Sequence, residues 1–183
     1  MIDGINIKQT STTGWGYNFA YLARSWAIKN GIIYQDGTSD KGGGRGELQY
    51  GATNYDHMTF FGTDYGVALN YAAWGTAKNS IFANINDVGI SGFNSYGAPA
   101  KFEYSNSLFH NNGLDANGPS VENGGGNIFG LDPMFASTDP NSPDFLFLQP
   151  GSPAETSGMG GTYMGARGVA GPSSPEWALD GSG

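Results

Sequence analysis

The chain has 183 residues, of which only 13% are charged and 31 are glycine, and its formal net charge is −8. This acidic balance argues against nucleic acid and anionic membranes as partners, because both select clustered Lys and Arg. The absence of cysteine excludes disulfides and thiolate metal sites. With 38% hydrophobic residues the chain can bury a core, and its glycine content favours frequent turns over long helices.

No targeting signal is recognisable at the start of the chain. Residues 1–10 lack the basic start and the apolar stretch of a signal peptide. No apolar run approaches the length of a membrane span. We therefore expect either a chain from which a signal was removed or one module of a longer protein.

Four segments share a pattern in which a polar residue and then Asn, or once His, precede apolar residues. In chain order these segments begin at Lys29, Asp56, Lys78 and Ser105. Their marker positions 30, 57, 79 and 106 are separated by 27, 22 and 27 residues, and a weaker copy at residues 4–7 lies 26 residues before Asn30. Repetition at this spacing is typical of a solenoid, so we expect about five coils.

Each copy continues into a turn rich in Gly, Asn or Asp, and further short strands are expected at residues 46–50, 66–70 and 89–93. Strands of this length, separated by turns, pair with the equivalent strands one coil away, in parallel and in register. The predicted fold is therefore all-β, a right-handed parallel β-helix. A short helix over residues 17–28 is the alternative in that segment, because its apolar residues also fit helical spacing.

The repeated Asn predicts a sharp bend between two strands. Such a bend needs a residue near the left-handed region of backbone space, which Asn tolerates. Stacked Asn side chains can also form hydrogen bonds from coil to coil. His57 takes this place in one copy, and we interpret it as a bend residue rather than as an acid or a base.

From Gly126 onward the pattern changes to an ending rich in proline and phenylalanine. Its characteristic residues are Gly126, Asn127, Ile128, Asp132, Pro133, Phe135, Asp144, Phe145, Leu148, residues 150–154, Gly158, Gly165 and Ala166. This ending resembles that of bacterial β-helix proteins of the pectate-lyase-like superfamily, especially the choice-of-anchor Q proteins, over roughly residues 76–166. Glu155 and Thr156 depart from the Ile-Asp pair that usually follows Ala154 in that pattern.

The resemblance implies a secreted or cell-surface protein whose last residues close the stack. Prolines cannot donate to a further strand, so a proline-rich ending protects an open edge. The side chains expected to plug the open core are Phe129, Met134, Phe135, Phe145, Phe147 and Leu148. We divide the chain into coils (residues 1–125), a last coil with its cap (126–166), and a tail or linker (167–183). Asp132 and Ser152 are then structural rather than catalytic.

Catalytic motifs of this superfamily are incomplete in the sequence. The polygalacturonase set of paired Asp, Gly-His-Gly and Arg-x-Lys does not occur, and no acidic cluster accompanies an arginine as in pectate lyases. Lys41 with Arg45 gives a weak resemblance to an alginate-lyase pair. Glu47, Asp56 and Asp64 offer a weak choice of glycosidase carboxylates. We therefore assign no catalytic residue.

Two turns, at residues 36–40 and 84–87, carry alternating oxygen-bearing side chains. Neither turn completes a calcium-binding loop, and Asn and Asp are in any case common turn residues. We expect no cofactor, and calcium remains an open alternative.

Tyr and Trp residues recur near the strand that precedes each bend. Adjacent strands lie roughly 4.8 Å apart, so equivalent residues in successive coils form a row whose step is comparable to one sugar ring. Aromatic faces bind the apolar faces of sugars, and polar side chains bind their hydroxyls. The predicted carbohydrate-binding residues are Tyr21, Trp26, Glu47, Gln49, Tyr50, Asn70, Tyr71, Trp74 and Tyr96. The alternative is that these rings pack inside the coils or cover the turns.

These features favour a non-catalytic carbohydrate-binding module for a plant-type polysaccharide, xylan- or glucan-like. The scarcity of Lys and Arg and the incomplete catalytic motifs support this choice. A polysaccharide lyase or glycoside hydrolase of the β-helix superfamily, or a piece of one, is the alternative, and a structural or adhesin stalk is a third. The expected partner is a polysaccharide, without nucleic acid or membrane, and a catalytic domain elsewhere in a longer chain is compatible with this role.

Overall fold

The computed structural model describes residues 1–9, 17–18, 26–35, 44–45, 52–69, 74–92 and 101–170. Within these ranges the regular structure is β-strand, apart from one 3-10 turn, η1 (Met159–Gly161). No helix in the described ranges is long and apolar enough to cross a membrane. The all-β prediction is confirmed, and where residues 17–28 are described they form strands rather than the alternative helix.

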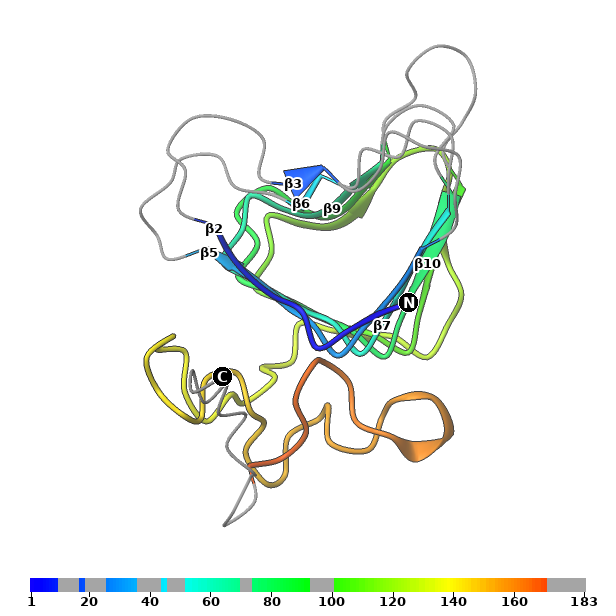
Figure 1. The fold of residues 1–183 in the computed structure, drawn as a ribbon. Helices are drawn as coiled ribbons and strands as arrows, with labels where there is room; N and C mark the ends of the chain where they lie inside the picture. The colour runs from blue at the N-terminus through cyan, green and yellow to red at the C-terminus, as the bar shows by residue number, and fades with distance from the viewer. Residues whose placement is uncertain are drawn as a thin grey trace.

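Two six-stranded parallel sheets make up most of the fold (Figure 1). Sheet A consists, in spatial order, of β1 (Ile2–Asp3), β4 (Trp26–Lys29), β7 (Ala52–Asp56), β10 (Trp74–Lys78), β13 (Lys101–Ser105) and β16 (Val121–Asn123). Sheet B consists, in the same direction, of β2 (Asn6–Gln9), β5 (Ile32–Gln35), β8 (Thr59–Phe61), β11 (Ile81–Ala83), β14 (Leu108–His110) and β17 (Ile128–Phe129).

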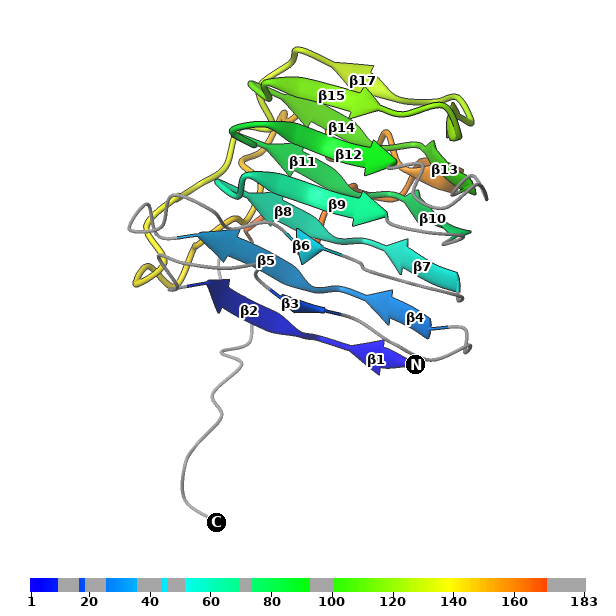
Figure 2. The same ribbon diagram turned by 90° about the horizontal axis from the view of Figure 1, so that it is seen from above.

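The remaining strands lie on a third side of the molecule (Figure 2). Three of them form sheet C, which contains β9 (Tyr65–Leu69), β12 (Val88–Gly92) and β15 (Leu114–Asn117). The other two, β3 (Tyr17–Asn18) and β6 (Gly44–Arg45), pair with each other. The chain visits these three sides in turn, so each sequence repeat supplies one strand to each. Strand pairing is parallel throughout, as the repeat spacing predicts.

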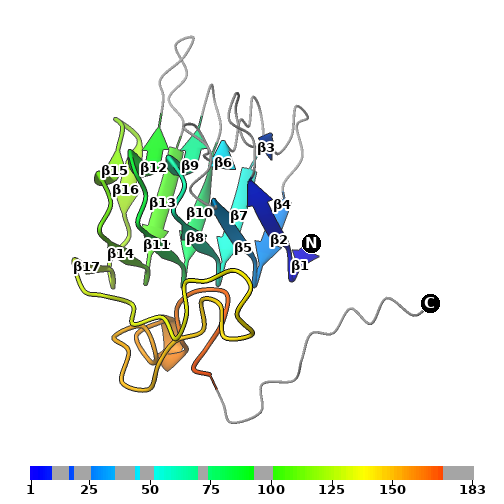
Figure 3. The ribbon, with the colours of Figure 1, turned by 90° about the vertical axis from the view of Figure 1, so that its left-hand side faces the viewer.

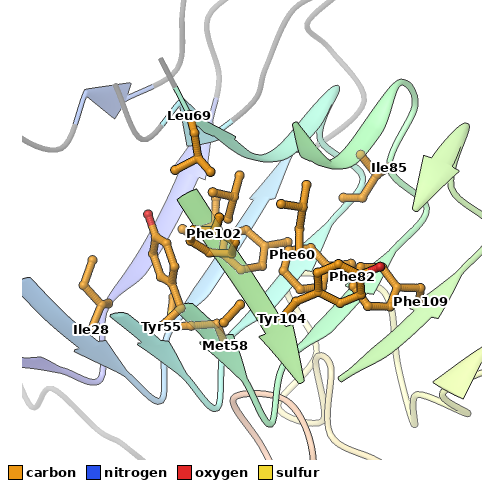
Figure 4. Close-up of a cluster of buried hydrophobic side chains, with 14 residues drawn as sticks. Ile28, Tyr55, Met58, Phe60, Leu69, Phe82, Ile85, Phe102, Tyr104 and Phe109 are labelled. Carbon is orange, nitrogen blue, oxygen red and sulfur yellow. The ribbon is translucent and has the colours of Figure 1, made fainter. Parts of the chain in front are cut away.

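The three sides surround one apolar interior (Figure 4). Sheet B lines it with a row that runs from Ile33 through Phe60, Phe82 and Phe109 to Phe129. The last four rings lie 4.7, 4.9 and 5.3 Å apart between centroids and are stacked nearly parallel. Because in-register strands bring like residues together, the repeat converts one phenylalanine per copy into a continuous aromatic column.

The bends between sheets A and B follow the prediction from the repeated Asn. Asn30, His57, Asn79 and Asn106 have φ angles of 52°, 53°, 50° and 46°, in the left-handed region. Only a few residue types adopt this region without strain, which explains why the marker recurs at every copy. The interpretation of His57 as a bend residue is therefore confirmed.

Side chains one residue after the bend link successive copies. The Ser80 hydroxyl accepts a hydrogen bond from the Met58 amide, and the Ser107 hydroxyl accepts one from the Ser80 amide, each at 3.2 Å. The Asn127 side chain accepts from the Ser107 amide at 2.9 Å. These bonds satisfy buried backbone donors that the bend removes from the sheet ladders.

Residues 131–170 lie beside sheet B rather than over the end of the stack (Figure 3). Leu148, Ala154 and Met164 pack on Ile81 and Leu108, whose side chains leave the outer face of sheet B. Backbone and side-chain bonds fix the segment, including Gly165 N–H to the Asn79 carbonyl at 2.7 Å. The expectation that this segment plugs the open core therefore differs from the structure.

The physical reason is that sheet B has two apolar faces, and its outer face must be covered from the side. Phe145 and Leu146 extend the cover to Ile32, with Tyr34 against Phe145 at 4.9 Å. At the end of the stack, Phe129 remains 45% exposed. The segment acts as a lateral cover that buries sheet B on both sides.

Candidate functional site: the outer face of sheet A

The outer face of sheet A is polar where that of sheet B is apolar. In β13 the burial alternates, with Lys101 and Glu103 exposed and Phe102 and Tyr104 buried. The same alternation places a middle row on the outer face, one residue per strand. In spatial order this middle row is Ala27, Asn54, Thr76, Glu103 and Glu122.

Neighbours in the middle row interact along the stack. The Thr76 hydroxyl donates to the Asn54 side-chain oxygen at 3.0 Å. Glu103 and Glu122 are register partners, so two carboxylates follow each other at the C-terminal end of the row. Lys101 lies 3.8 Å from Glu122 and offsets part of this negative charge. Hydroxyl, amide and carboxylate groups thus follow one another at strand spacing.

Trp74 is the large aromatic side chain that the described residues place on this face. It begins β10 and is 58% exposed, compared with 45% for Phe129. Its register partners are Ala52 on one side and Lys101 on the other. An exposed indole offers a flat apolar surface beside the middle row.

A third row alternates in charge next to the bends. Its members, in spatial order, are Asp3, Lys29, Asp56, Lys78 and Ser105. Asp56 lies 3.6 Å from the Lys29 ammonium and 3.5 Å from that of Lys78. Opposite charges that directly face each other across strands stabilise the pairing.

Asp56 is the centre of a hydrogen-bonded network. Its Oδ1 accepts from the Asn79 amide and contacts His57 Nδ1, each at 2.9 Å. Burial by itself raises the pKa of this carboxyl, but the hydrogen bond from Asn79 and the positive charges of His57 and Lys78 outweigh burial and hold the pKa below its ordinary value. Asp56 is therefore an ionised structural anion, unsuited to donate a proton.

The same network anchors the lateral cover. The Asn79 side-chain oxygen accepts from the Met159 amide at 2.7 Å, and the His57 ring lies edge-on to Tyr163 with centroids 5.0 Å apart. Burial raises the pKa of the Tyr163 phenol, and the negative charges of Asp3 and Asp56 raise it further. The side chains of the row next to the bends thus stabilise the fold and the position of the cover.

Of the predicted carbohydrate-binding residues, Trp74 lies on this outer face. Trp26 is described through its backbone, at the start of β4, where it is the register partner of Thr53. Thr53 pairs in turn with Gly75, so Trp26 and Trp74 belong to neighbouring rows rather than to one row. The others, Tyr21, Glu47, Gln49, Tyr50, Asn70, Tyr71 and Tyr96, lie outside the described residues.

Among the weak catalytic and metal candidates, Lys41, Glu47 and the turn at residues 36–40 lie outside the described residues, and the described ones separate. Asp56 ends β7 before the bend, whereas Asp64 lies beyond β8 in the turn to sheet C, where it accepts from the Asn86 amide at 3.0 Å. In the turn at residues 84–87, the Asn84 side-chain oxygen accepts from the Asn111 amide at 2.8 Å, so it links two successive copies of the repeat. Among the described residues no cluster of three His, Asp or Glu side chains is suited to a metal ion.

Sequence reasoning overlooked the middle row. The signal was present in residues 101–105, where charged and aromatic residues alternate strictly, as in a strand with one wet and one buried face. Glu103 of the middle row follows from that alternation, and its neighbour Glu122 follows from the register.

Comparison with known proteins returned no relatives: no protein-family profile matches the chain, and neither a curated protein nor a solved structure matches it.

Proposed function

We propose that the chain is a right-handed parallel β-helix of the pectate-lyase-like type, secreted or at the cell surface, that binds a neutral plant-type polysaccharide without cleaving it. The polymer, xylan- or glucan-like, lies along the outer face of sheet A. The observation that carries this proposal is the exposed Trp74 beside a row of hydrogen-bonding side chains on a sheet face that the lateral cover leaves open.

The geometry supports a linear ligand. Strands about 4.8 Å apart present Asn54, Thr76 and Glu103 at nearly equal steps, so a chain of sugar units meets a hydroxyl partner at each step. The indole of Trp74 provides the apolar surface against which one ring can stack. Binding of this kind needs no metal and no clustered positive charge.

A glycoside hydrolase is the second candidate, and one observation favours it. Glu103 and Glu122 are exposed neighbours on adjacent strands of this face. Strand spacing of about 4.8 Å is close to the roughly 5–5.5 Å between the two carboxyl groups of retaining glycosidases. Against it, Glu122 already has a partner in Lys101, whose ammonium lies 3.8 Å away.

The test is affinity gel electrophoresis of the full chain against xylan, mixed-linkage glucan and cellulose derivatives, together with a reducing-end assay on each polymer. We expect at least one neutral polymer to retard the protein without release of new ends. Trp74→Ala should abolish the retardation, because the indole supplies most of the apolar contact.

The matched control is Phe129→Ala, which removes another exposed aromatic ring at the end of the stack, away from this face. It should leave retardation unchanged. New reducing ends that vanish in Glu122→Gln would establish the hydrolase instead, and retardation by no polymer would leave the stalk as the best explanation.

A further inference from the structure

A cavity of about 390 Å³ lies between sheet B and the lateral cover, on a different side of the molecule from the outer face of sheet A. Sheet B contributes Phe61, Ala83 and His110, and residues between 132 and 149 of the cover line the other side. This volume falls within the range of small-molecule sites, roughly 300–1,000 Å³. The cavity is therefore large enough for one or two sugar units.

His110 is the unexplained residue of this cavity. Its Nδ1 is buried and has no hydrogen-bond partner within the described part of the chain. An unsatisfied buried polar atom destabilises a fold, so its presence calls for an explanation. The His110 ring lines the cavity, so it is positioned to contact a ligand bound there.

Asp132 and Gln149 also line the cavity, and each uses one side-chain atom in a hydrogen bond within the protein. Asp132 uses Oδ1 to accept from the Met134 amide at 2.7 Å, which leaves its second oxygen. Gln149 donates its amide to the Phe135 carbonyl at 2.9 Å, which leaves its side-chain oxygen as an acceptor. These bonds fix both side chains, so the remaining oxygens are held in place for a ligand.

The apolar part of the wall is also preorganised. Phe61 and Phe135 contact each other edge to face, with centroids 5.9 Å apart. Met134 has a φ of 54°, a conformation that a long side chain rarely adopts and that tends to occur at binding sites. It is held there by the Asp132 side chain, which accepts from the Met134 N–H, and by the backbone N–H of Gln149, which donates to the Met134 carbonyl at 2.8 Å.

We infer that this cavity binds a neutral mono- or disaccharide, with His110, Asp132 and Gln149 as hydroxyl partners and the two phenylalanines as the apolar wall. Fixed acceptors beside aromatic rings suit a polyhydroxylated ring better than a lipid, which needs no polar partners, or an anion, which Asp132 repels. The inference does not depend on sheet A, because none of its residues lies on that sheet.

The test is a titration of the full chain with xylose, glucose, galactose, xylobiose and cellobiose, followed by the NMR signals of the His110 ring. We expect one of these sugars to shift the signals with a dissociation constant on the order of millimolar, as the ligand size allows. His110→Phe should weaken binding about tenfold, the loss of one hydrogen bond. The same variant should unfold at an equal or higher temperature, because it removes an unsatisfied buried atom.

His57→Phe is the matched control, the same change at the other histidine. It breaks the bond to Asp56 and should lower the melting temperature while sugar binding at the cavity persists. No shift with any sugar, or binding that His110→Phe leaves intact, would overturn the inference. Binding lost in Trp74→Ala but kept in His110→Phe would assign the sugar to sheet A instead.

Discussion

At the bend between β13 and β14, the backbone of Asn106 is left-handed with a φ of 46°. An L-residue other than Asn, Asp or Gly in this region costs about 1–2 kcal/mol. We therefore expect Asn106→Ala to lower the free energy of unfolding by about that amount in urea titrations, and Asn106→Gly to lower it less. Equal losses in the two variants would show that the Asn side chain, and not its backbone preference, is what the bend requires.

The Asp56 network predicts how the free energy of unfolding depends on pH. Its pKa is lower in the folded chain than its ordinary value of 3.8, so the unfolded chain binds the proton more tightly. Its stabilising contribution is then complete above the ordinary value and is lost as the pH falls through the folded pKa. We expect Asp56→Asn to lose about 1–3 kcal/mol near neutral pH. The difference from the parent should shrink below about pH 4.

The control for Asp56→Asn is Glu103→Gln, an exposed carboxylate whose removal should give no comparable pH-dependent difference in unfolding. If the free energies of unfolding of the parent and Asp56→Asn differed by the same amount down to the lowest pH, the role given to the Asp56 network would be contradicted.

For single residues, the sequence predicts backbone conformation better than it predicts side-chain contacts. The bends at Asn30, Asn79 and Asn106 follow from residue type alone, because positive φ selects Asn. The Asp56 network does not, because its partners lie on neighbouring copies and on the lateral cover. Which residues meet there depends on the register, and successive copies differ in length.

Among the elements, sheet B explains where the C-terminal segment lies. Its strands begin with apolar pairs, Ile32-Ile33, Ile81-Phe82 and Leu108-Phe109, in which one residue faces the core and the other faces outward. Continuous apolar runs of this kind are typical of parallel strands buried on both faces. The sequence therefore held the signal for a covered sheet, but the proline-rich ending alone indicated only that an edge is protected.

The phenylalanine column yields the prediction for elements. Phe82 is enclosed between Phe60 and Phe109, with ring centroids 4.7 and 4.9 Å away. Phe82→Ala should lower the free energy of unfolding by about 3–5 kcal/mol, because β8, β11 and β14 lose a shared contact and a cavity remains. Phe129→Ala, at the exposed end of the column, should cost much less. Similar losses of unfolding free energy at both positions in denaturant titrations would contradict a column that is buried in its middle and exposed at its end.

For the whole molecule, the position of the lateral cover decides which sheet face stays open to a polymer. The cover buries the outer face of sheet B, whereas Asn54, Glu103 and Glu122 of the middle row and Trp74 on sheet A stay exposed. The repeat predicted the sheets, but not which of them stays open, because that depends on how residues 131–170 fold back.

The net charge of −8 then separates the two kinds of polymer that this face could meet. Raising the salt from about 0.1 M to about 1 M shortens the screening length from about 10 Å to about 3 Å. A neutral xylan or glucan held by Trp74 and by hydroxyl contacts should keep its dissociation constant within about twofold, because those contacts are short-ranged. Polygalacturonate should not bind at the lower salt, since Glu103 and Glu122 repel it. Isothermal titration at both salt concentrations measures this, and tight binding of the anionic polymer that salt abolishes would instead identify Lys101 and its neighbours as the binding surface.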